Sequence, residues 1–480
     1  MKNETIIQYF EWYLPEDAGH WKRCRDAATE LAEYGITFAW LPPAYKGQAG
    51  IHDVGYGVYD TYDLGEFNQK GTIPTKYGTK DEYLEAVQEL QAEGVQVLGD
   101  IVLNHRMGAD EQEKVLATKE NWGNRFQDIS GEEEVEVWTK FTFPGRAGKY
   151  SDFQWNWTHF DGTDWDEERK EKALFRFKGK EWENGVDDEN GNYDYLMGDD
   201  LDMGNPEVME ELERWGKWYL DMTGIDGMRL DAVKHINFEF FHQWLGKMRA
   251  YKGRDFFVVG EYWSPDTNKL VHYLNETDKC MQLFDVPLHF KFYEASHAGG
   301  NYDMRNLLKN TLTEADSWHA VTFVDNHDTQ PGQALQSFVM DWFKPLAYGI
   351  ILLQEAGIPC VFYGDYYGIP HDNIPPVSEL KKLLQLRKDY AYGTQHSYYD
   401  HPDVVGFTRE GVEEKPESGL ALLVSDGPGG SKQMYIGKQF AGKTFYDAMG
   451  KCSERVVIGA DGCGTFRVEG GSISVWVTEE

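Results

Sequence analysis

Short apolar runs alternate with amphipathic stretches along the first hundred residues. The runs at 6–10, 36–42 and 95–105 are predicted to be strands. The segments 20–33 and 80–93 have apolar residues at helical spacing, and a glycine closely follows each of them. Strands that alternate with helices in this way indicate parallel βα units.

The alternation breaks after the third strand. Residues 106–205 are rich in Trp, Gly, Asp and Asn, with short strand-like pieces such as 137–143 and no long periodic helix. The helical pattern resumes at Asn205-Pro206, which combines a helix-capping residue with a proline in the first turn. We therefore expect a separate domain inserted between two parts of one larger domain.

The second part continues the βα pattern up to about residue 393. Further strands are expected at 225–230, 256–261, 281–287, 320–328 and 358–364, and further helices at 206–222, 237–251, 266–274, 302–313, 336–356 and 376–389. Together with the earlier elements, the sequence contains eight strands and eight helices. This number predicts a (β/α)8 TIM barrel.

The last stretch of the chain has a different pattern. Strand-like runs at 404–410, 420–426, 443–448, 454–458 and 472–478 are separated by Gly and Pro turns. They predict a C-terminal antiparallel β-sandwich domain. The expected organisation is thus a barrel domain (A) at 1–103 and 206–393, an inserted, irregular β-rich domain (B) at 104–205, and domain C at 394–480.

Charge narrows the classes of partner. The chain of 480 residues has 81 acidic and 47 basic residues, which gives a formal charge of −34. This balance argues against nucleic acid and anionic membranes as partners, and it favours cation binding. Aromatic residues make up 15 % of the chain, including 16 Trp. Most of these rings belong in a core, but a surplus also suits sugars, whose apolar C–H faces lie flat on aromatic rings.

Several features bear on location. No apolar run reaches the ~18 residues of a membrane span. The N-terminal sequence MKNETIIQYFEW lacks the apolar segment of a secretory leader. The five cysteines are scattered, which favours free thiols in a reducing compartment. We expect a monomeric cytoplasmic protein; the alternative is a secreted protein whose leader is absent from this chain.

Candidate chemistry gathers at the predicted ends of the strands, where barrel active sites lie. These strand-end residues are Asp100, Asn104, His105, Arg229, Asp231, Glu261, Asp325, Asn326, His327 and Asp328. Any one of them alone could be a cap, a structural ion pair or a structural histidine. Several acids on one face are different, because like charges placed close together cost free energy unless a function uses them.

Two carboxyl groups are enough for glycoside hydrolysis. Arg229 and Asp231 are two residues apart and point to the same side of a strand, so a fixed guanidinium can hold Asp231 ionised as a nucleophile. Glu261 follows an apolar run and precedes two aromatics, and desolvation there should raise its pKa and make it the acid. Asp328 would grip ring hydroxyls, and His105 and His327 would donate hydrogen bonds to the same sugar.

Four motifs carry a resemblance to a known family. DIVLNH (100–105), GMRLDAVKH (227–235), GEYW (260–263) and FVDNHD (323–328) resemble the four conserved regions of the alpha-amylase family of glycoside hydrolases, in the family's order. The resemblance extends from QYFEWY near the N-terminus to DGPGG in the last domain, and it is closest to the bacterial liquefying and cytoplasmic members. It implies a calcium-containing, retaining endo-hydrolase of alpha-1,4-glucans such as starch and glycogen.

The resemblance also assigns roles to particular residues. It implies that Asp231 is the nucleophile, Glu261 the acid/base and Asp328 the transition-state stabiliser. The substrate-binding residues implied in the same way are Tyr56 as an aromatic platform, Asp100, His105, Arg229 and His327 around the central sugar, and Lys234, His235 and Trp263 on the leaving-group side.

A metal site is implied as well. Residues 193–202 carry four acids, a pattern that a solvated acidic loop would also show. By resemblance, Asn104, Asp194, Asp200 and the backbone carbonyl of His235 form a structural calcium site between domains A and B. Asp161, Glu183 and Asp202 resemble an accessory cluster for sodium or a second calcium. The chain departs from the family in this cluster, because Glu183 and Gly204 each stand at a position where the liquefying enzymes usually have an Asp.

Two further expectations concern ions. A calcium between domains A and C would involve Gly300, Tyr302, Asp403 and Asp426. The stretch TQPGQ after FVDNHD has no Arg or Lys where chloride-dependent relatives carry one, so we expect no chloride requirement.

The alternatives are other enzymes of the same family, namely a maltogenic amylase, an alpha-1,6-glucosidase or a transglycosidase. The long inserted domain and the Lys234-His235 pair favour endo cleavage of alpha-1,4 bonds. An inactive carbohydrate-binding protein is a further alternative, but it would be expected to lack one of Asp231, Glu261 and Asp328.

Overall fold

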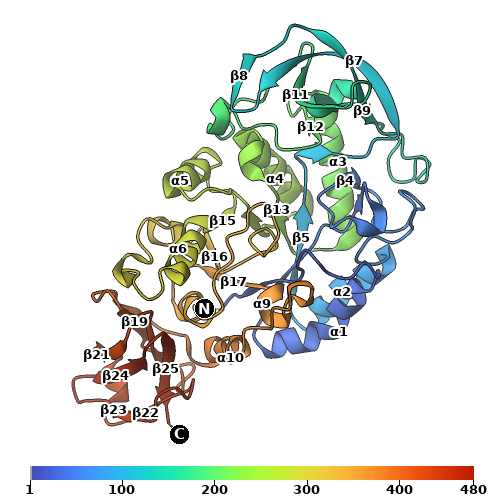
Figure 1. The fold of residues 1–480 in the computed structure, drawn as a ribbon. Helices are drawn as coiled ribbons and strands as arrows, with labels where there is room; N and C mark the ends of the chain where they lie inside the picture. The colour runs from blue at the N-terminus through green and yellow to red at the C-terminus, as the bar shows by residue number, and fades with distance from the viewer. Residues whose placement is uncertain (1–2, 480) are drawn as a thin grey trace.

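A closed barrel of eight parallel strands forms the centre of the molecule (Figure 1). The computed structural model describes residues 3–479, so the expected domain ends at residues 1, 2 and 480 lie outside it. The barrel strands are, in order around the barrel, β1 (Ile6–Gln8), β17 (Ile358–Phe362), β16 (Ala320–Phe323), β15 (Gln282–Phe284), β14 (Phe257–Gly260), β13 (Gly227–Leu230), β5 (Gln96–Ile101) and β2 (Phe38–Leu41). The predicted (β/α)8 architecture is confirmed.

Strand register decides which polar residues become neighbours. In the parallel ladder Arg229 of β13 is paired with Asp100 of β5, and Leu230 is paired with Gly260 of β14. Asp231 and Glu261 therefore leave adjacent strands at the same level, at the C-terminal end of the barrel. This is the end at which TIM barrels carry their active sites.

Helices cover the outside of the barrel. They are α1 (His20–Glu33), α2 (Lys80–Ala92), α3 (Pro206–Thr223), α4 (Phe238–Lys252), α5 (Thr267–Glu276), α6 (Val286–His297), α8 (Lys344–Leu353) and α10 (Leu380–Tyr390), with the short α7 (Leu312–Ala315) and α9 (Tyr363–Tyr367). The predicted caps are present. Thr79 and Glu82 form a capping box at α2, and Asn205 caps α3 with Pro206 in its first turn.

Two predicted helices were wrong. The segment 302–313 holds only a 3-10 turn (Met304–Asn306) and the start of α7, whereas α6 begins at Val286, directly after β15. β15 ends before the predicted strand end at residue 287, because the Asp285 side chain accepts a hydrogen bond from the amide of Leu288 and so caps α6. The long helix predicted at 336–356 exists only from Lys344 onward, with Pro345 in its first turn.

The segment after β5 forms its own sheet, drawn at the top of Figure 1. Its strands are β6 (His105–Arg106), β12 (Asp199–Leu201), β10 (Phe160–Asp166), β11 (Glu171–Phe177), β7 (Glu111–Asn121) and β8 (Asn124–Asp128) in this order, with β9 (Glu133–Lys140) also paired to β7. β6 follows the barrel strand β5 closely and pairs with β12, so the sheet begins directly above the barrel mouth.

The C-terminal strands form two sheets. β18 (Gln395–Tyr398), β19 (Val404–Arg409), β20 (Leu420–Ser425), β25 (Ser472–Thr478), β22 (Thr444–Asp447) and β23 (Arg455–Val457) make one, and β21 (Gly429–Tyr435) with β24 (Cys463–Glu469) makes the other. Side chains of β20 alternate between two cores. Leu422 packs in the same core as the barrel, whereas Ala421 and Leu423 face the small sheet.

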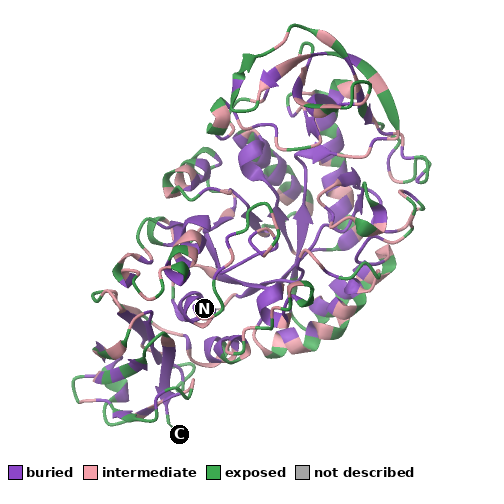
Figure 2. Cartoon of the chain, in the orientation of Figure 1, coloured by how far each residue is buried: buried purple, intermediate pink, exposed green. Residues whose placement is uncertain are grey.

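The large sheet also contacts the barrel helix α8 closely. A Cβ placed on Gly349 of α8 would lie 2.2 Å from Cδ1 of Ile473 in β25 and 3.2 Å from Cδ1 of Leu422. Figure 2 shows buried residues running from the barrel strands into the C-terminal sheet. All five cysteines have free thiols, as predicted. Among residues 3–479, the structure has no helix with the length and apolar character of a membrane span.

Candidate active site

A cleft of about 490 Å³ opens at the C-terminal ends of the barrel strands. It brings together most of the residues that the sequence singled out: Tyr56, His105, Asp231, Lys234, His235, Glu261, Trp263, His327 and Asp328. Residues that sequence reasoning missed also line it: Trp12, Tyr193, Leu196, Met197, Gln333, Ala334 and Leu335. Leu196 and Met197 come from the inserted sheet domain, and Gln333 to Leu335 come from the loop after β16.

One guanidinium organises the acids of the cleft. Nη1 of Arg229 donates to Asp231 Oδ1 at 2.6 Å and to Asp100 Oδ1 at 3.0 Å, and Nη2 donates to Glu261 Oε2 at 2.7 Å. Arg229 is wholly buried, so these contacts lie in a medium of low polarity and are strong. The predicted pairing of Arg229 with Asp231 is present, and the same cation also holds Glu261.

Glu261 is placed so that it keeps a proton. The pKa of Glu261 is raised to about 8, chiefly by burial and also by the charges of Asp231 and Asp328, against the lowering effect of Arg229. Its Oε2 also accepts the backbone N–H of Ala232 at 3.3 Å. Ala232 adopts a left-handed conformation with φ of 50°, which turns the chain sharply just after Asp231.

Asp100 lies beneath the cleft rather than in its lining. The side chain is wholly buried, and its Oδ2 accepts from Trp40 Nε1 and from the Tyr56 hydroxyl, each at 2.9 Å. Oδ1 accepts from Arg229. Both oxygens are thus engaged, and Asp100 holds Tyr56 and Arg229 in place; its role in substrate binding stays a prediction.

Three rings with nearly parallel planes lie close together at one side of the cleft. Tyr56 lies 5.1 Å from His327 with an interplanar angle of 8°, and Trp12 lies 6.2 Å from Tyr56 at 4°. Gln8 on β1 donates through Nε2 to Nδ1 of His327 at 2.9 Å. The other ring nitrogen, Nε2, therefore carries the hydrogen and faces Asp328 Oδ2 at 3.3 Å.

The two ring nitrogens of His105 have the same roles as those of His327, but the partner of its Nε2 is a backbone carbonyl. Its Nε2 lies 2.8 Å from the backbone carbonyl of Tyr56, so this nitrogen must be the donor. Burial lowers the pKa of His105, which keeps the ring neutral. Nδ1 is then a buried acceptor, and it has no partner within the described chain. The predicted hydrogen bond from His105 to a sugar stays a prediction, and in this structure the ring N–H is taken by the Tyr56 carbonyl.

The loop that carries Asp328 is held from below. Asn326 Oδ1 accepts the backbone N–H groups of Asp328 and Thr329, both at 2.9 Å. Thr329 donates its hydroxyl to Asp325 Oδ1 at 2.8 Å. Asp325 Oδ2 lies 3.1 Å from Nζ of Lys344, a fully buried lysine at the start of α8 that also pairs with Asp365. Lys344 lies outside every motif, so no sequence pattern indicated it.

Lys234 and His235 join the inserted sheet domain to the barrel. Lys234 Nζ donates to Glu189 Oε2 at 3.1 Å and to the carbonyl of Trp263 at 3.0 Å. His235 donates through Nδ1 to the carbonyl of Tyr193 at 2.7 Å. Both side chains therefore fix the loop of residues 187–193 over the side of the cleft on which Trp263 lies.

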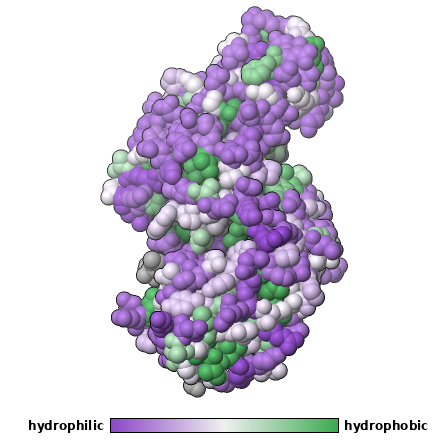
Figure 3. Space-filling view, turned by 90° about the vertical axis from the view of Figure 1, so that its left-hand side faces the viewer, coloured by the Kyte–Doolittle hydropathy of each residue, from purple (hydrophilic) through white to green (hydrophobic). Residues whose placement is uncertain are grey.

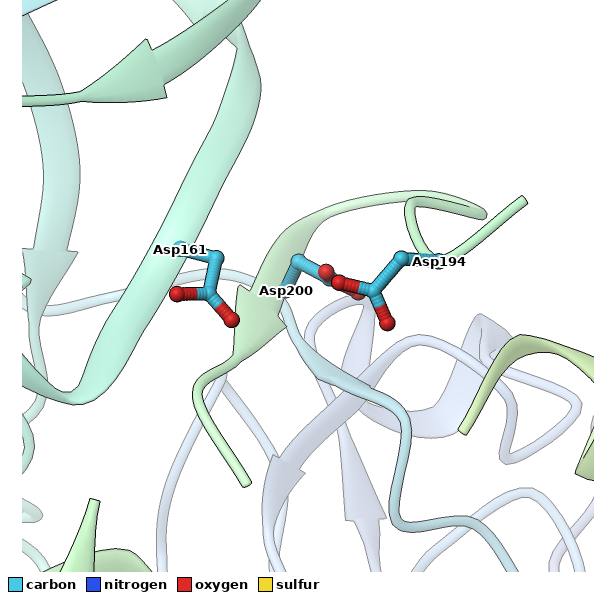
Figure 4. A group of neighbouring side chains, drawn as sticks. All are labelled: Asp161, Asp194 and Asp200. Atoms are coloured by element: carbon cyan, nitrogen blue, oxygen red, sulfur yellow. The ribbon is translucent and has the colours of Figure 1, made fainter. Parts of the chain in front are cut away.

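Three buried carboxylates form a candidate metal centre. Asp161, Asp194 and Asp200 come from β10, a loop and β12, and each offers an oxygen within 4.8 Å of the others (Figure 4). Burial and the charges of neighbouring carboxylates raise the pKa of Asp161 to about 9 and that of Asp194 to about 8. Oδ2 of Asp161 and Oδ2 of Asp200 are buried without a hydrogen-bond partner in the described chain.

These features fit calcium, which takes hard oxygen ligands and compensates clustered carboxylates. The predicted ligand Asn104 lies against the cluster, with Nδ2 3.3 Å from Asp200 Oδ1. His235 lies close by through its contact with Tyr193, the residue before Asp194.

The accessory cluster is different in character. Asp161, Glu183 and Asp202 also offer oxygens within 4.8 Å of one another. However, Asp202 pairs with Nζ of Lys180, and Glu183 Oε1 accepts the backbone N–H of Gly204 at 2.8 Å. The chain itself therefore supplies a positive charge and a donor to this cluster, which weakens its demand for a second divalent ion.

The expected site between barrel and C-terminal domain is partly assembled. Asp426 accepts the backbone N–H of Tyr302 at 3.2 Å, and its Oδ1 is buried without a partner among the described residues. Burial raises the pKa of Asp426 to about 6. Asp403 packs beside Gly427, so this second carboxylate lies close to Asp426.

Known proteins resemble the chain along its whole length. A family model described as "Alpha amylase, catalytic domain" matches residues 10–389, and one described as "Alpha-amylase C-terminal" matches residues 428–477. An alpha-amylase of Geobacillus stearothermophilus is 59 % identical over 478 residues, covering 99 % of this chain and 87 % of that protein. A cytoplasmic alpha-amylase of Escherichia coli K12 is 44 % identical and both chains are covered completely.

One further curated relative and one solved structure add to this. A glucan 1,4-alpha-maltohexaosidase of Bacillus sp. strain 707 is 51 % identical, with 99 % of this chain and 93 % of that protein covered. The crystal structure of an alpha-amylase from Geobacillus thermoleovorans, complexed with acarbose, has a TM-score of 0.66 at 20 % identity. It covers 100 % of this chain and 98 % of that one, and it supports the fold alone.

Proposed function

Because the chain belongs to the alpha-amylase family of glycoside hydrolases and is a hydrolase of alpha-1,4-glucans, we propose that it cleaves starch, glycogen and maltooligosaccharides internally, with retention of configuration. The observation that carries this proposal is the sharing of Arg229 between Asp231 and Glu261. One carboxyl group is tied to a cation at 2.6 Å, and the other keeps its proton through burial. These are the two states that a retaining mechanism needs at the outset.

The mechanism assigns each acid one task. Asp231 attacks the anomeric carbon while Glu261 gives its proton to the glycosidic oxygen, so the leaving chain departs as an alcohol and a covalent glycosyl ester forms on Asp231. Glu261, now ionised, takes a proton from water, which attacks the same carbon and releases Asp231. Retaining glycosidases hold the two carboxyl groups about 5–5.5 Å apart.

The surrounding residues act on the sugar before and during these steps. Asp328 and the Nε2–H of His327 face each other in the cleft, where both can bind ring hydroxyls. His105 and Tyr56 line the same part of the cleft, where Tyr56 offers its ring face to the sugar. Arg229 holds the Asp231 carboxyl group in position through its hydrogen bond at 2.6 Å. Lys234, His235 and Trp263 border the leaving-group side.

Calcium would be held by Asn104, Asp161, Asp194 and Asp200, with the carbonyl of His235 as a further oxygen ligand. Its contribution when bound is structural, since it would tie the inserted sheet domain to the barrel. The loop that carries Tyr193 and Leu196 would then be held in place beside the cleft. The accessory cluster with Glu183 and Asp202 takes sodium rather than a second calcium, since Lys180 already offsets part of its charge. We expect no chloride requirement.

The setting that we propose is a monomeric, cytoplasmic enzyme of α-glucan metabolism. Support comes from the free thiols and from the likeness to a relative named as cytoplasmic over the full length of both chains. The alternative is a secreted enzyme. Fractionation of the source cells with an antibody against the chain distinguishes the two.

A timed product analysis on amylose tests the proposed reaction. Endo cleavage predicts a rapid loss of viscosity with mixed maltooligosaccharides, and proton NMR should detect the α-anomer first because configuration is retained. Maltose alone would favour a maltogenic enzyme, maltohexaose alone would favour the specificity named for the Bacillus sp. strain 707 relative, and cyclic or elongated products would favour a transglycosidase. An initial β-anomer would overturn the retaining mechanism.

A further inference from the structure

An exposed apolar patch lies on the hairpin of β7 and β8. Within eight residues of this hairpin, Trp122 is 42 % exposed, Phe126 is 76 % exposed and Ile129 is 58 % exposed. The hairpin is largely exposed in Figure 2, and β8 lies at the left of the inserted sheet domain in Figure 1. Figure 3 views that side and shows hydrophobic groups on a mainly hydrophilic surface. Grouped exposed rings of this kind mark interaction sites, because folding gains little from them.

A series of stacked groups connects Trp122 with the cleft. The ring of Trp122 lies 6.0 Å from that of Tyr195, in an edge-to-face arrangement. Beneath them, Arg125 donates to the carbonyl of Tyr195 at 2.6 Å and places its guanidinium 4.7 Å from the ring centre of Tyr193. Tyr193 lines the cleft, with Lys234 Nζ 4.7 Å from its ring centre. These contacts pass through the buried Tyr195 and Arg125, and they link the hairpin to the loop that lines the cleft on the Lys234 side.

Phe126 is connected with the same side by a second route. A Cβ on Gly191 would lie 2.9 Å from Cδ2 of Phe126, so this ring packs directly on the 3-10 turn Glu189–Gly191. Glu189, at the start of that turn, pairs with Lys234. The aromatic ring thus rests on the loop that closes the cleft.

We propose that Trp122 and Phe126 form a glucan-binding platform, which takes glucose units of a long chain after they leave the cleft on the Lys234 side. This inference rests on the proposed function and extends it. The flat faces of the two rings suit the apolar faces of glucose. The chain carries a formal charge of −34, which does not repel an uncharged polysaccharide. An anionic polymer or membrane would be repelled.

The platform should matter only for substrates long enough to reach it. The Trp122→Ala/Phe126→Ala variant should raise KM for long amylose roughly three- to tenfold, which corresponds to the loss of weak stacking contacts. Its kcat should stay unchanged, and so should both constants for maltotetraose. Trp318→Ala is the matched control. Trp318 is 83 % exposed but lies just before β16, at the opposite end of the barrel, so its removal should change neither KM.

Three results would overturn the platform. They are an unchanged KM for amylose in the double variant, an equal rise in KM for maltotetraose, or a loss of self-association in sedimentation, which would assign the patch to a second copy. The proposed function is judged separately on the unaltered enzyme. If that enzyme cleaves amylose internally and the double variant matches it, only the platform fails.

Discussion

Arg229 donates through Nη2 to Oε2 of Glu261 at 2.7 Å. A guanidinium is always a donor, so Oε2 must be the accepting oxygen and the proton of the acid must reside on Oε1. The proposed acid/base is therefore oriented as well as protonated before substrate arrives. The same cation stabilises the carboxylate that Glu261 becomes after it has given up its proton.

The first prediction concerns the two proposed catalytic carboxyl groups. Glu261→Gln keeps the shape and the acceptor for Arg229 but cannot give a proton, so kcat should fall roughly 10²- to 10⁴-fold. Asp231→Asn removes the nucleophile and should abolish measurable hydrolysis. Initial rates on amylose test both variants, and near-UV circular dichroism should match the unaltered enzyme. Near-normal starch hydrolysis by either folded variant would refute the assignment.

The second prediction concerns the alkaline side of the pH profile. Glu261 works as an acid only while protonated, and its pKa is raised to about 8, so kcat/KM should be retained below that pH and lost as pH rises through it. The charge of Asp328 contributes to this rise. In Asp328→Asn the residual activity should therefore fall off at a lower pH. A midpoint that stays unchanged in this variant would contradict the electrostatic coupling.

The third prediction concerns the candidate calcium centre. A ligand present at a thousandfold excess over its Kd adds about 4 kcal/mol to stability, so a chelator should lower Tm and activity together. Asp200→Asn should lower Tm in calcium and should respond weakly to chelator, because it removes a buried ligand. Asp202→Asn is the matched control, since Asp202 already pairs with Lys180, and it should keep the full response. A Tm that chelator leaves unchanged would argue against a structural calcium.

The fourth prediction concerns the buried lysine under the Asp328 loop. Lys344→Met leaves Asp325 and Asp365 buried without their cation, which should cost about 3–5 kcal/mol of unfolding free energy. The double variant with Asp365→Asn should regain part of this loss. Because Asp325 holds Thr329, kcat should fall in both variants while KM changes little. Thermal unfolding and steady-state kinetics measure the two effects, and a Tm equal to that of the unaltered enzyme would contradict the prediction.

The fifth prediction concerns anions. Arg229 and Lys234, the cations at the cleft, each contact carboxylates, which leaves chloride little to bind. Rates in sodium chloride and in sodium acetate of equal ionic strength should agree, because matched ionic strength removes general screening effects. A marked rise that is specific to chloride would refute it.

Sequence patterns predicted the elements of this fold that hydrophobic periodicity and capping residues determine. The eight barrel strands, the capped starts of α2 and α3, and the insertion after β5 were all visible as periodicity and capping residues. The start of α6 was missed although Asp285 caps it and Pro287 lies in its first turn, because the apolar run 281–287 reads as one continuous strand through that cap. The helix predicted from residue 336 begins only at Lys344. The residues before it are held in another conformation by a distant contact, in which Asp325 accepts the backbone N–H of Val339.

The supporting residues of the cleft could not be predicted from the sequence. Gln8 and His327 lie 319 positions apart, yet their hydrogen bond decides which nitrogen of the histidine donates. Likewise, Lys180 reaches Asp202 only because two strands of the inserted sheet domain bring them together. Motifs identified the groups that face the substrate, whereas the groups that orient them are specified by packing between distant segments.

The close approach of Gly349 to Ile473 has a consequence for recombination between homologues. Helix α8 belongs to the barrel, yet Leu422 and Ile473 of the C-terminal sheets fill a hollow that only a glycine leaves open. A crossover placed in the linker after α10 would separate surfaces shaped for each other. Chimeras should therefore fold best when α8 and the C-terminal sheets come from the same parent. The unit that can be exchanged is then α8 together with the C-terminal domain, and not the C-terminal domain alone.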